Sequence, residues 1–483
     1  MPQSDSMRAA LAEVLRIALP LMVSTGMFSL VLFIDRTLLL WHEPTQMGAA
    51  MAAGNLFWVT ICVFVGMVSM TGAIASQYVG AGQRSRIGRL LWQSIWFSLA
   101  TIPLFAGLGY FAESLFEATG QAPSLVPMEA IYYRILLWGG AGEVMQTALS
   151  GFFSGTHRTR TIAIVSIFSG LVNLVLDLVL IFGIDPAWLG MAAVDGGERW
   201  LEMGIAGAAI ASVISFWFKA FCYGGLLLLP NFRKTYGMVS GMCWDARMMR
   251  RLVYYGFPTG LMYATEAGAF SVIVLMIGRL GDVPLQATTM AINFNMVAFI
   301  PLVGMSIAAS VLVGQHLVRS GPEFAGRRVW AALIISWIYA SAWALTYWLG
   351  ADILISLYEL NPTAAETVGD ASIAADATRS LQIAEGLLGF VAIYVVLDAT
   401  QLILAGALRG AGDSWFVLVT GLTVSVTFLV IGVAFEPEWT RNTPSAFQAL
   451  QWWWWILTGW VIALGLAMTA RYAQGSWKQM RMV

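Results

Sequence analysis

Long apolar runs are the feature that most constrains this chain. A helix that crosses a bilayer needs about 20 mostly apolar residues, and the sequence contains twelve such runs. A closed barrel would instead alternate apolar and polar residues, and stretches such as 329–349 do not alternate. We therefore predict an all-α integral membrane protein with twelve transmembrane helices. The predicted spans are 14–40, 48–79, 90–116, 130–153, 161–183, 204–229, 252–279, 285–315, 329–358, 380–408, 414–435 and 446–470.

Composition supports the lipid bilayer as the main partner. Of the 483 residues, 59% are hydrophobic and 11% are charged, whereas soluble domains contain about 25% charged residues. The net charge of −1 provides no basic field for a nucleic acid. Three cysteines are too few for a secreted disulfide scaffold. These values exclude a nucleic-acid binder and a disordered chain.

Basic residues predict the orientation, because cytoplasmic loops are enriched in Lys and Arg. Alternate loops hold most of the 26 basic residues, and the opposite loops are acidic. Both termini are therefore expected in the cytoplasm. The basic side includes Arg8, Arg16, Arg84, Arg86, Arg89, Arg158, Arg160, Arg233, Lys234, Arg319, Arg327, Arg328 and Arg471, and the acidic side includes Asp195, Glu198, Glu202, Glu366 and Asp370.

The sequence contains an internal repeat. Six spans in each half give both halves the same orientation, so the repeats are parallel and are expected to flank a central cleft suited to alternating access. We assign the two six-helix lobes to residues 1–235 and 236–483. The matched residues are Pro20 with Pro258, Gln77 with Gln315 and Trp92 with Trp330 at one offset, and, after an insertion, Glu143 with Asp398, Gln146 with Gln401, Gly151 with Gly406 and Gly155 with Gly410.

No motif for ATP hydrolysis or zinc catalysis is visible. None of the three lysines follows a glycine, so a phosphate-binding loop is absent, and the three histidines form no H-E-x-x-H pair. We predict that the protein is not an enzyme and needs no cofactor. Transport against a gradient would then depend on a coupling ion.

Acids inside apolar spans are the candidate functional residues, since a carboxylate at the bilayer centre costs about 2.5–3.5 kcal/mol. Asp35 lies in the first span, and Asn173 and Asp177 share one face of the fifth. These hard oxygen donors suit a proton or Na⁺. The alternative is a structural hydrogen-bonded link between the two helices.

A second candidate site lies in the other half. Glu266 is on the seventh span, and Asp398 is on the tenth with Tyr394 one turn earlier. They suggest a second proton or Na⁺ site, or else a structural pair that shares one proton. Glu143 and Gln401 are possible secondary residues, and Glu143 is either functional or a relic of the duplication.

The chain resembles the multidrug and toxic compound extrusion (MATE) transporters over nearly its whole length. This resemblance implies export of lipophilic, mostly cationic drugs in exchange for Na⁺ or H⁺. It also implies a functional acid at Asp35, near Asn173 and Asp177, and the NorM-like branch adds Glu266, Tyr394 and Asp398. Arg36, which follows the first-span acid, departs from the pattern. The segments that carry the resemblance are 75–82, 151–156, 256–266 and 398–410.

The resemblance sets the remaining expectations. We expect a bacterial-type plasma (inner) membrane protein that works as a monomer. One alternative is a lipid-linked saccharide flippase of the same superfamily, which would need deep basic residues such as Arg36 and Lys219. An intramembrane enzyme and a receptor are further alternatives. We interpret Trp452–Trp455 as part of an aromatic belt at the membrane interface.

Overall fold

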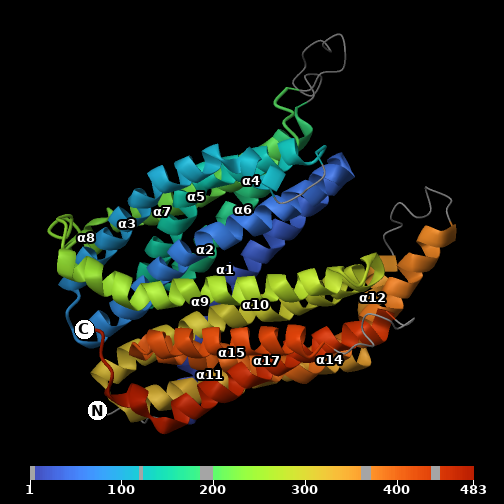
Figure 1. Cartoon of the computed structure of the whole chain (residues 1–483). Helices are drawn as coiled ribbons and strands as arrows, with labels where there is room; N and C mark the ends of the chain where they lie inside the picture. Colours follow the sequence, from blue (N-terminus) through green and yellow to red (C-terminus); the bar gives the residue numbers. More distant parts are fainter. Residues whose placement is uncertain (1–5, 119–122, 185–199, 360–370, 437–445) are drawn as a thin grey trace. The chain divides into compact units, whose positions relative to one another are not determined.

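The computed structural model describes residues 6–118, 123–184, 200–359, 371–436 and 446–483 (Figure 1). Asp195, Glu198, Glu366 and Asp370, which we assigned to the acidic side, lie outside these residues. The described part is helical, with one isolated bridge between Ile184 and Trp200. The long helices are α1 (Met7–His42), α2 (Pro44–Gly80), α3 (Ser85–Tyr110), α5 (Val126–Gly155), α6 (Thr159–Phe182), α7 (Ile205–Leu227), α9 (Ala246–Gly278), α10 (Asp282–Arg319), α11 (Pro322–Leu349), α14 (Ala371–Ala411), α15 (Ser414–Ala434) and α17 (Ala446–Gln474).

Each of the twelve predicted spans coincides with one of these long helices, and this confirms the predicted fold class. Eleven of them are long and apolar enough to cross a membrane by length and composition alone. The twelfth, α5, contains Arg134, Glu143 and Gln146, which lower its hydropathy. It contacts α2, α3, α4 and α7. Because neighbouring helices surround it, α5 tolerates polar residues that a lipid-facing helix would not.

Two predicted spans are interrupted. The expected span 90–116 divides into α3 and α4 (Ala112–Ala118), and 329–358 divides into α11 and α12 (Ala351–Glu359). The breaks fall after the third long helix of each half, at Phe111 and at Gly350, and in both cases the residue at the break leaves helical geometry. The shared position of the breaks is a further trace of the duplication.

The chain forms two compact units. The amino-terminal unit contains Ile17–Leu261, Gly314–Arg319 and Arg481–Val483, and the carboxyl-terminal unit contains Met1–Arg16, Met262–Val313 and Ser320–Met480. The packing inside the two units is equivalent. In the first, α5 contacts α3, α4 and α7, and α6 contacts α7; in the second, α14 contacts α11, α12 and α17, and α15 contacts α17.

Small residues allow the central helix of each unit to approach its neighbour closely. A Cβ atom added to Gly155 on α5 would lie 2.5 Å from the carbonyl oxygen of Gly72 on α2. The repeat-related Gly410 on α14 would place a Cβ atom 2.1 Å from the carbonyl oxygen of Ser310 on α10. Both distances are too short for any side chain, so these glycines are required for backbone contact.

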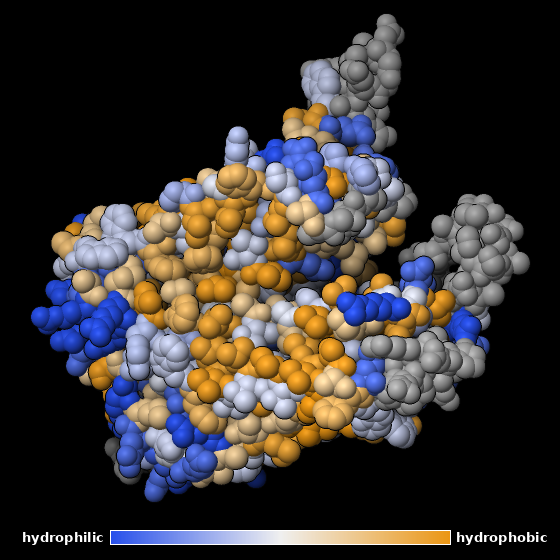
Figure 2. Space-filling model, viewed as in Figure 1, coloured by the Kyte–Doolittle hydropathy of each residue, from blue (hydrophilic) through white to orange (hydrophobic). Residues whose placement is uncertain are grey.

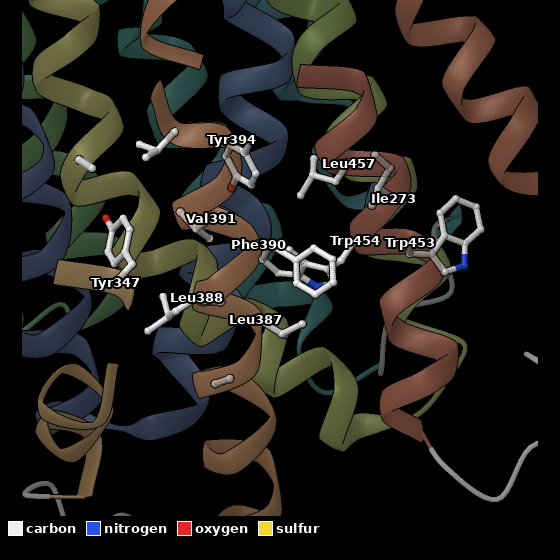
Figure 3. Packing of buried hydrophobic residues seen from close by; sticks show 14 of the residues in the cluster. Ile273, Tyr347, Leu387, Leu388, Phe390, Val391, Tyr394, Trp453, Trp454 and Leu457 are labelled. Carbon is white, nitrogen blue, oxygen red and sulfur yellow. The ribbon is translucent and has the colours of Figure 1, made fainter. Parts of the chain in front are cut away.

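The tryptophan run corrects one of our interpretations. Trp453 and Trp454 have no exposed surface and belong to the hydrophobic core of the carboxyl-terminal unit (Figure 3), and Trp455 is exposed. Trp454 donates a hydrogen bond to Thr288. Successive helical residues point about 100° apart, so four in a row cannot all face the interface. The run is therefore mainly a packing element and not an aromatic belt.

The protein surface is apolar over the helices, and Figure 2 shows broad hydrophobic areas on its visible face. Helix α6 illustrates the arrangement, because its exposed side is apolar and its buried side holds the polar residues of its membrane-spanning part together with small and aliphatic ones. This is the distribution expected for a helix between lipid and a polar protein interior. The exposed residues are Ile164, Phe168, Leu171, Val175 and Leu178, and the buried ones include Ser166, Ser169, Asn173 and Asp177.

Candidate ion-binding sites

The amino-terminal unit contains a buried acid cluster made of Asp35, Asn173, Asp177 and Ser212. Helix α1 supplies Asp35, α6 supplies Asn173 and Asp177, and α7 supplies Ser212. When the Asn173 amide nitrogen faces the acids, it donates to Asp35 Oδ1 at 3.0 Å and to Asp177 Oδ2 at 3.1 Å. Ser212 donates to Asp35 Oδ2 at 3.3 Å. The structure thus brings together all three residues predicted for this site.

Asp35 and Asp177 share one amide donor, and this arrangement suits a bound positive charge. The Asn173 amide bridges Asp35 and Asp177, and the charge of Asp35 acts on Asp177; a proton on one of the two carboxyl groups would remove this repulsion. The Asn173 amide provides an alternative, because turning it would direct its oxygen at the same place, where oxygen ligands suit Na⁺. Asp177 Oδ1 is buried and has no hydrogen-bond partner among the described residues. The cluster can therefore hold a proton or a small hard cation.

Arg36 does not form an ion pair with Asp35, although the two residues are adjacent in the chain. Its charge acts on Asp35, but no ion pair within 4.0 Å joins the two among the described residues. Arg36 is half-buried, whereas Asp35 is 3% exposed. Neighbouring residues on a helix point in different directions, and this accounts for the absence of an ion pair between Arg36 and Asp35.

The carboxyl-terminal unit contains a second group of acids. Glu266 on α9 accepts a hydrogen bond from Gln401 on α14 at 3.5 Å. Asp398, one turn before Gln401, lies close enough to Glu266 for the two charges to interact. Tyr394, one turn before Asp398 on α14, is buried and faces the apolar core (Figure 3). The predicted residues Glu266, Tyr394 and Asp398 thus belong to one neighbourhood, and Gln401 connects its two helices.

Sequence reasoning missed two participants. Arg409 on α14 lies close enough for its charge to act on Glu266, and its guanidinium is 5.8 Å from the ring centre of Tyr263. Tyr263 is one turn before Glu266 on α9. The sequence does not show that Arg409 of α14 faces this part of α9, because that depends on how the two helices pack. The second missed residue is Ser212. In the sequence it is one of several serines in apolar spans, so nothing marked it as part of a site.

Glu143 has a local environment of its own in the amino-terminal unit. It is 8% exposed on α5 and accepts a hydrogen bond from Gln146 at 2.8 Å. The charge of Lys219 on α7 acts on it. This contact identifies the acid that faces Lys219, which the sequence left open.

The described residues form no cluster typical of a transition-metal centre. Among the described residues, no group of three or more His, Cys, Asp or Glu side chains could hold a metal ion. The two acid groups instead combine carboxylates with an amide and a hydroxyl or phenol. Such hard oxygen ligands suit a proton or a small hard cation such as Na⁺.

Helical bundles with duplicated halves and buried acids in apolar helices are typical of secondary transporters. The sequence matches the model of the MatE family over residues 20–179 and 258–436. The chain therefore belongs to the MatE family, whose members are transporters and not enzymes. It is a multi-pass membrane protein with twelve transmembrane helices.

Similar proteins agree with this assignment. The chain is 30% identical over 406 residues to a "Probable multidrug resistance protein NorM" of Xanthomonas campestris, with 82% of this chain and 81% of that relative covered. It is 27% identical over 414 residues to "Multidrug resistance protein PmpM" of Pseudomonas aeruginosa, with 84% and 80% covered. The fold resembles a crystal structure of MATE in complex with MaD3S, with a TM-score of 0.80, 17% identity, and 98% and 97% of the two chains covered.

Proposed function

We propose that this protein is a secondary active multidrug exporter that moves lipophilic, mostly cationic compounds outward in exchange for Na⁺ or H⁺. The names of the curated relatives support the drug-export part of this proposal. The observation that carries the exchange part is the buried cluster of Asp35, Asn173, Asp177 and Ser212. Its two acids are bridged by the Asn173 amide, and neither forms an ion pair with a basic side chain among the described residues.

The chemistry of this cluster supports a coupling role. Without a bound ion, two ionised carboxylates that share one amide donor repel each other strongly in a low-dielectric interior. A proton or Na⁺ relieves this repulsion, so helix packing around Asp35 and Asp177 differs in free energy between the loaded and unloaded states. An ion can drive export only through such a difference in affinity between two conformations. Alternating access of a cleft then connects ion entry with drug exit.

The carboxyl-terminal acids fit the same role as a second ion site. Glu266 and Asp398 are close enough to interact, Gln401 contacts Glu266, and Arg409 offsets part of the negative charge. We propose that this site and the acid cluster both bind coupling ions. In the orientation that the basic loops predict, both termini are in the cytoplasm and the protein is in the plasma membrane of a bacterial-type cell.

Efflux from proteoliposomes tests the proposal. Purified protein is reconstituted, a fluorescent lipophilic cation is loaded, and an inward Na⁺ gradient or an inward proton gradient is imposed separately. We expect dye export under at least one gradient and none when both are collapsed. Export that ignores both gradients, or no export of any cationic dye, would contradict the proposal. Translocation of a lipid-linked saccharide without dye export would favour the flippase alternative.

A further inference from the structure

Helix α6 carries a polar stripe that extends beyond the acid cluster. Ser166, Ser169, Asn173 and Asp177 are spaced by three or four residues, so they share one face. All four are buried. At 1.5 Å per residue, the stripe is about 16 Å long and covers roughly half of the apolar thickness of a bilayer. Apolar packing alone does not require four polar residues in register on a membrane helix.

Helix α7 presents a matching stripe made of Ser212, Ser215, Lys219 and Tyr223, and it contacts α6. Two contacts link the stripes at successive levels. The Ser169 hydroxyl donates to the backbone carbonyl oxygen of Ser215 at 3.2 Å, and Ser166 lies within hydrogen-bonding reach of Tyr223. At the ends of the row, Ser212 donates to Asp35 of α1 at 3.3 Å, and Ser166 shares a hydrogen bond with Ser24 of α1 at 2.6 Å. We call this row of polar groups the ladder.

The ladder ends beside Glu143. Tyr223 lies close enough to Glu143 to interact with its charge, and Lys219 does so as well. These two are the charged and titratable groups that face Glu143, and Gln146 is its hydrogen-bond donor. The other elements that contact α5, namely α2, α3, α4 and α6, direct no further charged side chain at Glu143 within the described residues.

Unsatisfied polar atoms lie along the whole ladder. Asp177 Oδ1 at one end, Ser215 Oγ in the middle and Glu143 Oε2 at the other end are buried without a hydrogen-bond partner among the described residues. Such atoms are rare in folded proteins unless a water molecule or a transferred ion satisfies them. Their alignment on one ladder indicates a route that water or protons occupy.

We propose that this ladder is a proton path within the amino-terminal unit, and that it connects the acid cluster to Glu143. The inference rests on the proposed function in its proton-coupled form. One O–H bond breaks at the Asp35–Asp177 pair, the serine and tyrosine hydroxyls and the water molecules that bridge them each accept one proton and donate another, and one O–H bond forms at Glu143. Lys219 offsets the negative charge of Glu143 before the proton arrives. Side chains one turn apart have Cβ atoms about 5–6 Å apart, so a bridging water molecule carries the proton between their hydroxyls.

The decisive variant is Glu143→Gln, which keeps the shape of the side chain and the hydrogen bond with Gln146 but cannot accept a proton. We expect proton-driven dye efflux to fall by about tenfold or more, while the dissociation constant of the dye in detergent stays unchanged. Glu143→Asp should restore part of the rate. A Glu143→Gln protein with the wild-type rate and the wild-type pH profile would overturn the path.

The double variant Ser169→Ala/Ser215→Ala interrupts the ladder without touching an acid. We expect a slower proton-driven rate and a larger solvent deuterium isotope effect than in the wild type, because proton transfer becomes more limiting. The matched control is Ser98→Ala, a buried serine of α3 whose hydroxyl donates only within its own helix, to the carbonyl oxygen of Ser94 at 2.8 Å. If the double variant and the control have the same rate and isotope effect, the ladder does not conduct protons. This pair also decides the question if Glu143→Gln fails to fold.

Failure of the path and failure of the proposed function give different results. An Asp35→Asn protein with wild-type efflux would overturn the proposed exchange itself. Inactive Asp35→Asn with fully active Glu143→Gln would overturn the path alone. A wild-type protein that exports dye under a Na⁺ gradient and not under a proton gradient would also overturn the path, and would leave the exporter proposal standing.

Discussion

The two units of this transporter share their packing but differ in their charges. Gly155 and Gly410 occupy equivalent positions on α5 and α14, and both permit backbone contact with the neighbouring helix. The two proposed ion sites do not follow this symmetry. Asp35 and Asp177 lie on α1 and α6, whereas Glu266 and Asp398 lie on α9 and α14. Duplication has preserved the contacts that fix the fold, and the polar residues have diverged between the halves.

The central helices show this divergence most clearly. Glu143 on α5 and Asp398 on α14 are repeat-related acids, each with a glutamine three residues later. Glu143 faces the cation Lys219, whereas Asp398 faces the acid Glu266. An acid beside a cation is balanced without a bound ion, and an acid beside an acid is not. The same position can therefore serve proton transfer in one unit and ion binding in the other.

The largest expected effect comes from neutralising the acids of either unit. Asp35→Asn and Asp398→Asn should each lower ion-driven dye efflux by about a hundredfold or more, because each removes a group that alternates between loaded and unloaded states. Both proteins should remain folded, since the change removes a buried charge. Glu117→Gln, an exposed acid on α4, is the control. If one of the two acid variants exports dye at the control rate, only the other unit binds a coupling ion.

The packing symmetry has its own test. Gly155→Ala and Gly410→Ala should each lower the free energy of unfolding by roughly 1–3 kcal/mol because the helices must separate. The loss should be larger at Gly410, where the added Cβ atom would lie closer to a backbone oxygen. Gly389→Ala on α14 is the matched control, since nothing lies within 4 Å of its added Cβ atom. Equal stability of all three variants in mixed-micelle unfolding would show that the glycine contacts are not conserved constraints.

A smaller effect is expected from removing the cation Lys219, which faces Glu143 in the amino-terminal unit. Lys219→Gln should lower the free energy of unfolding by about 1 kcal/mol, because Glu143 loses the cation that faces it and Lys219 is only half-buried. The double variant Glu143→Gln/Lys219→Gln should regain most of this loss. A double variant in which the two losses simply add would mean that the residues do not interact.

The smallest effect concerns an acid outside the membrane spans. Hydrogen bonds from Thr45 and Gln46 hold the pKa of Glu43 below its ordinary value of 4.5. A lowered pKa in the folded state adds stability above the ordinary value, and this stability is lost as the pH falls through the folded pKa. The melting temperature of the wild-type protein should therefore be slightly higher than that of Glu43→Gln at neutral pH. The difference between the two proteins should vanish in acid. A difference that grows in acid would contradict this sign.

The sequence was sufficient for the fold and for the placement of Asn173 and Asp177 on one helix face. Apolar runs located twelve helices, and the spacing of Asn173 and Asp177 placed both on the face that meets Asp35. It was insufficient for contacts between helices distant in the chain. Ser212, the cation that faces Glu143 and the position of Arg409 near Glu266 depend on which helix faces which. The burial of Trp453 and Trp454 likewise depends on tertiary packing and not on local composition.

Competition between ion and drug tests the central claim most directly. In detergent solution, a lipophilic cation is titrated into the wild-type protein while released protons and Na⁺ are counted, and the titration is repeated with Asp35→Asn. Exchange predicts that dye binding releases ions from the wild type and fewer from the variant, since ligands with opposite preferences for two states weaken each other's binding. Dye binding that releases no ion from the wild type, or releases as many from Asp35→Asn, would contradict the account.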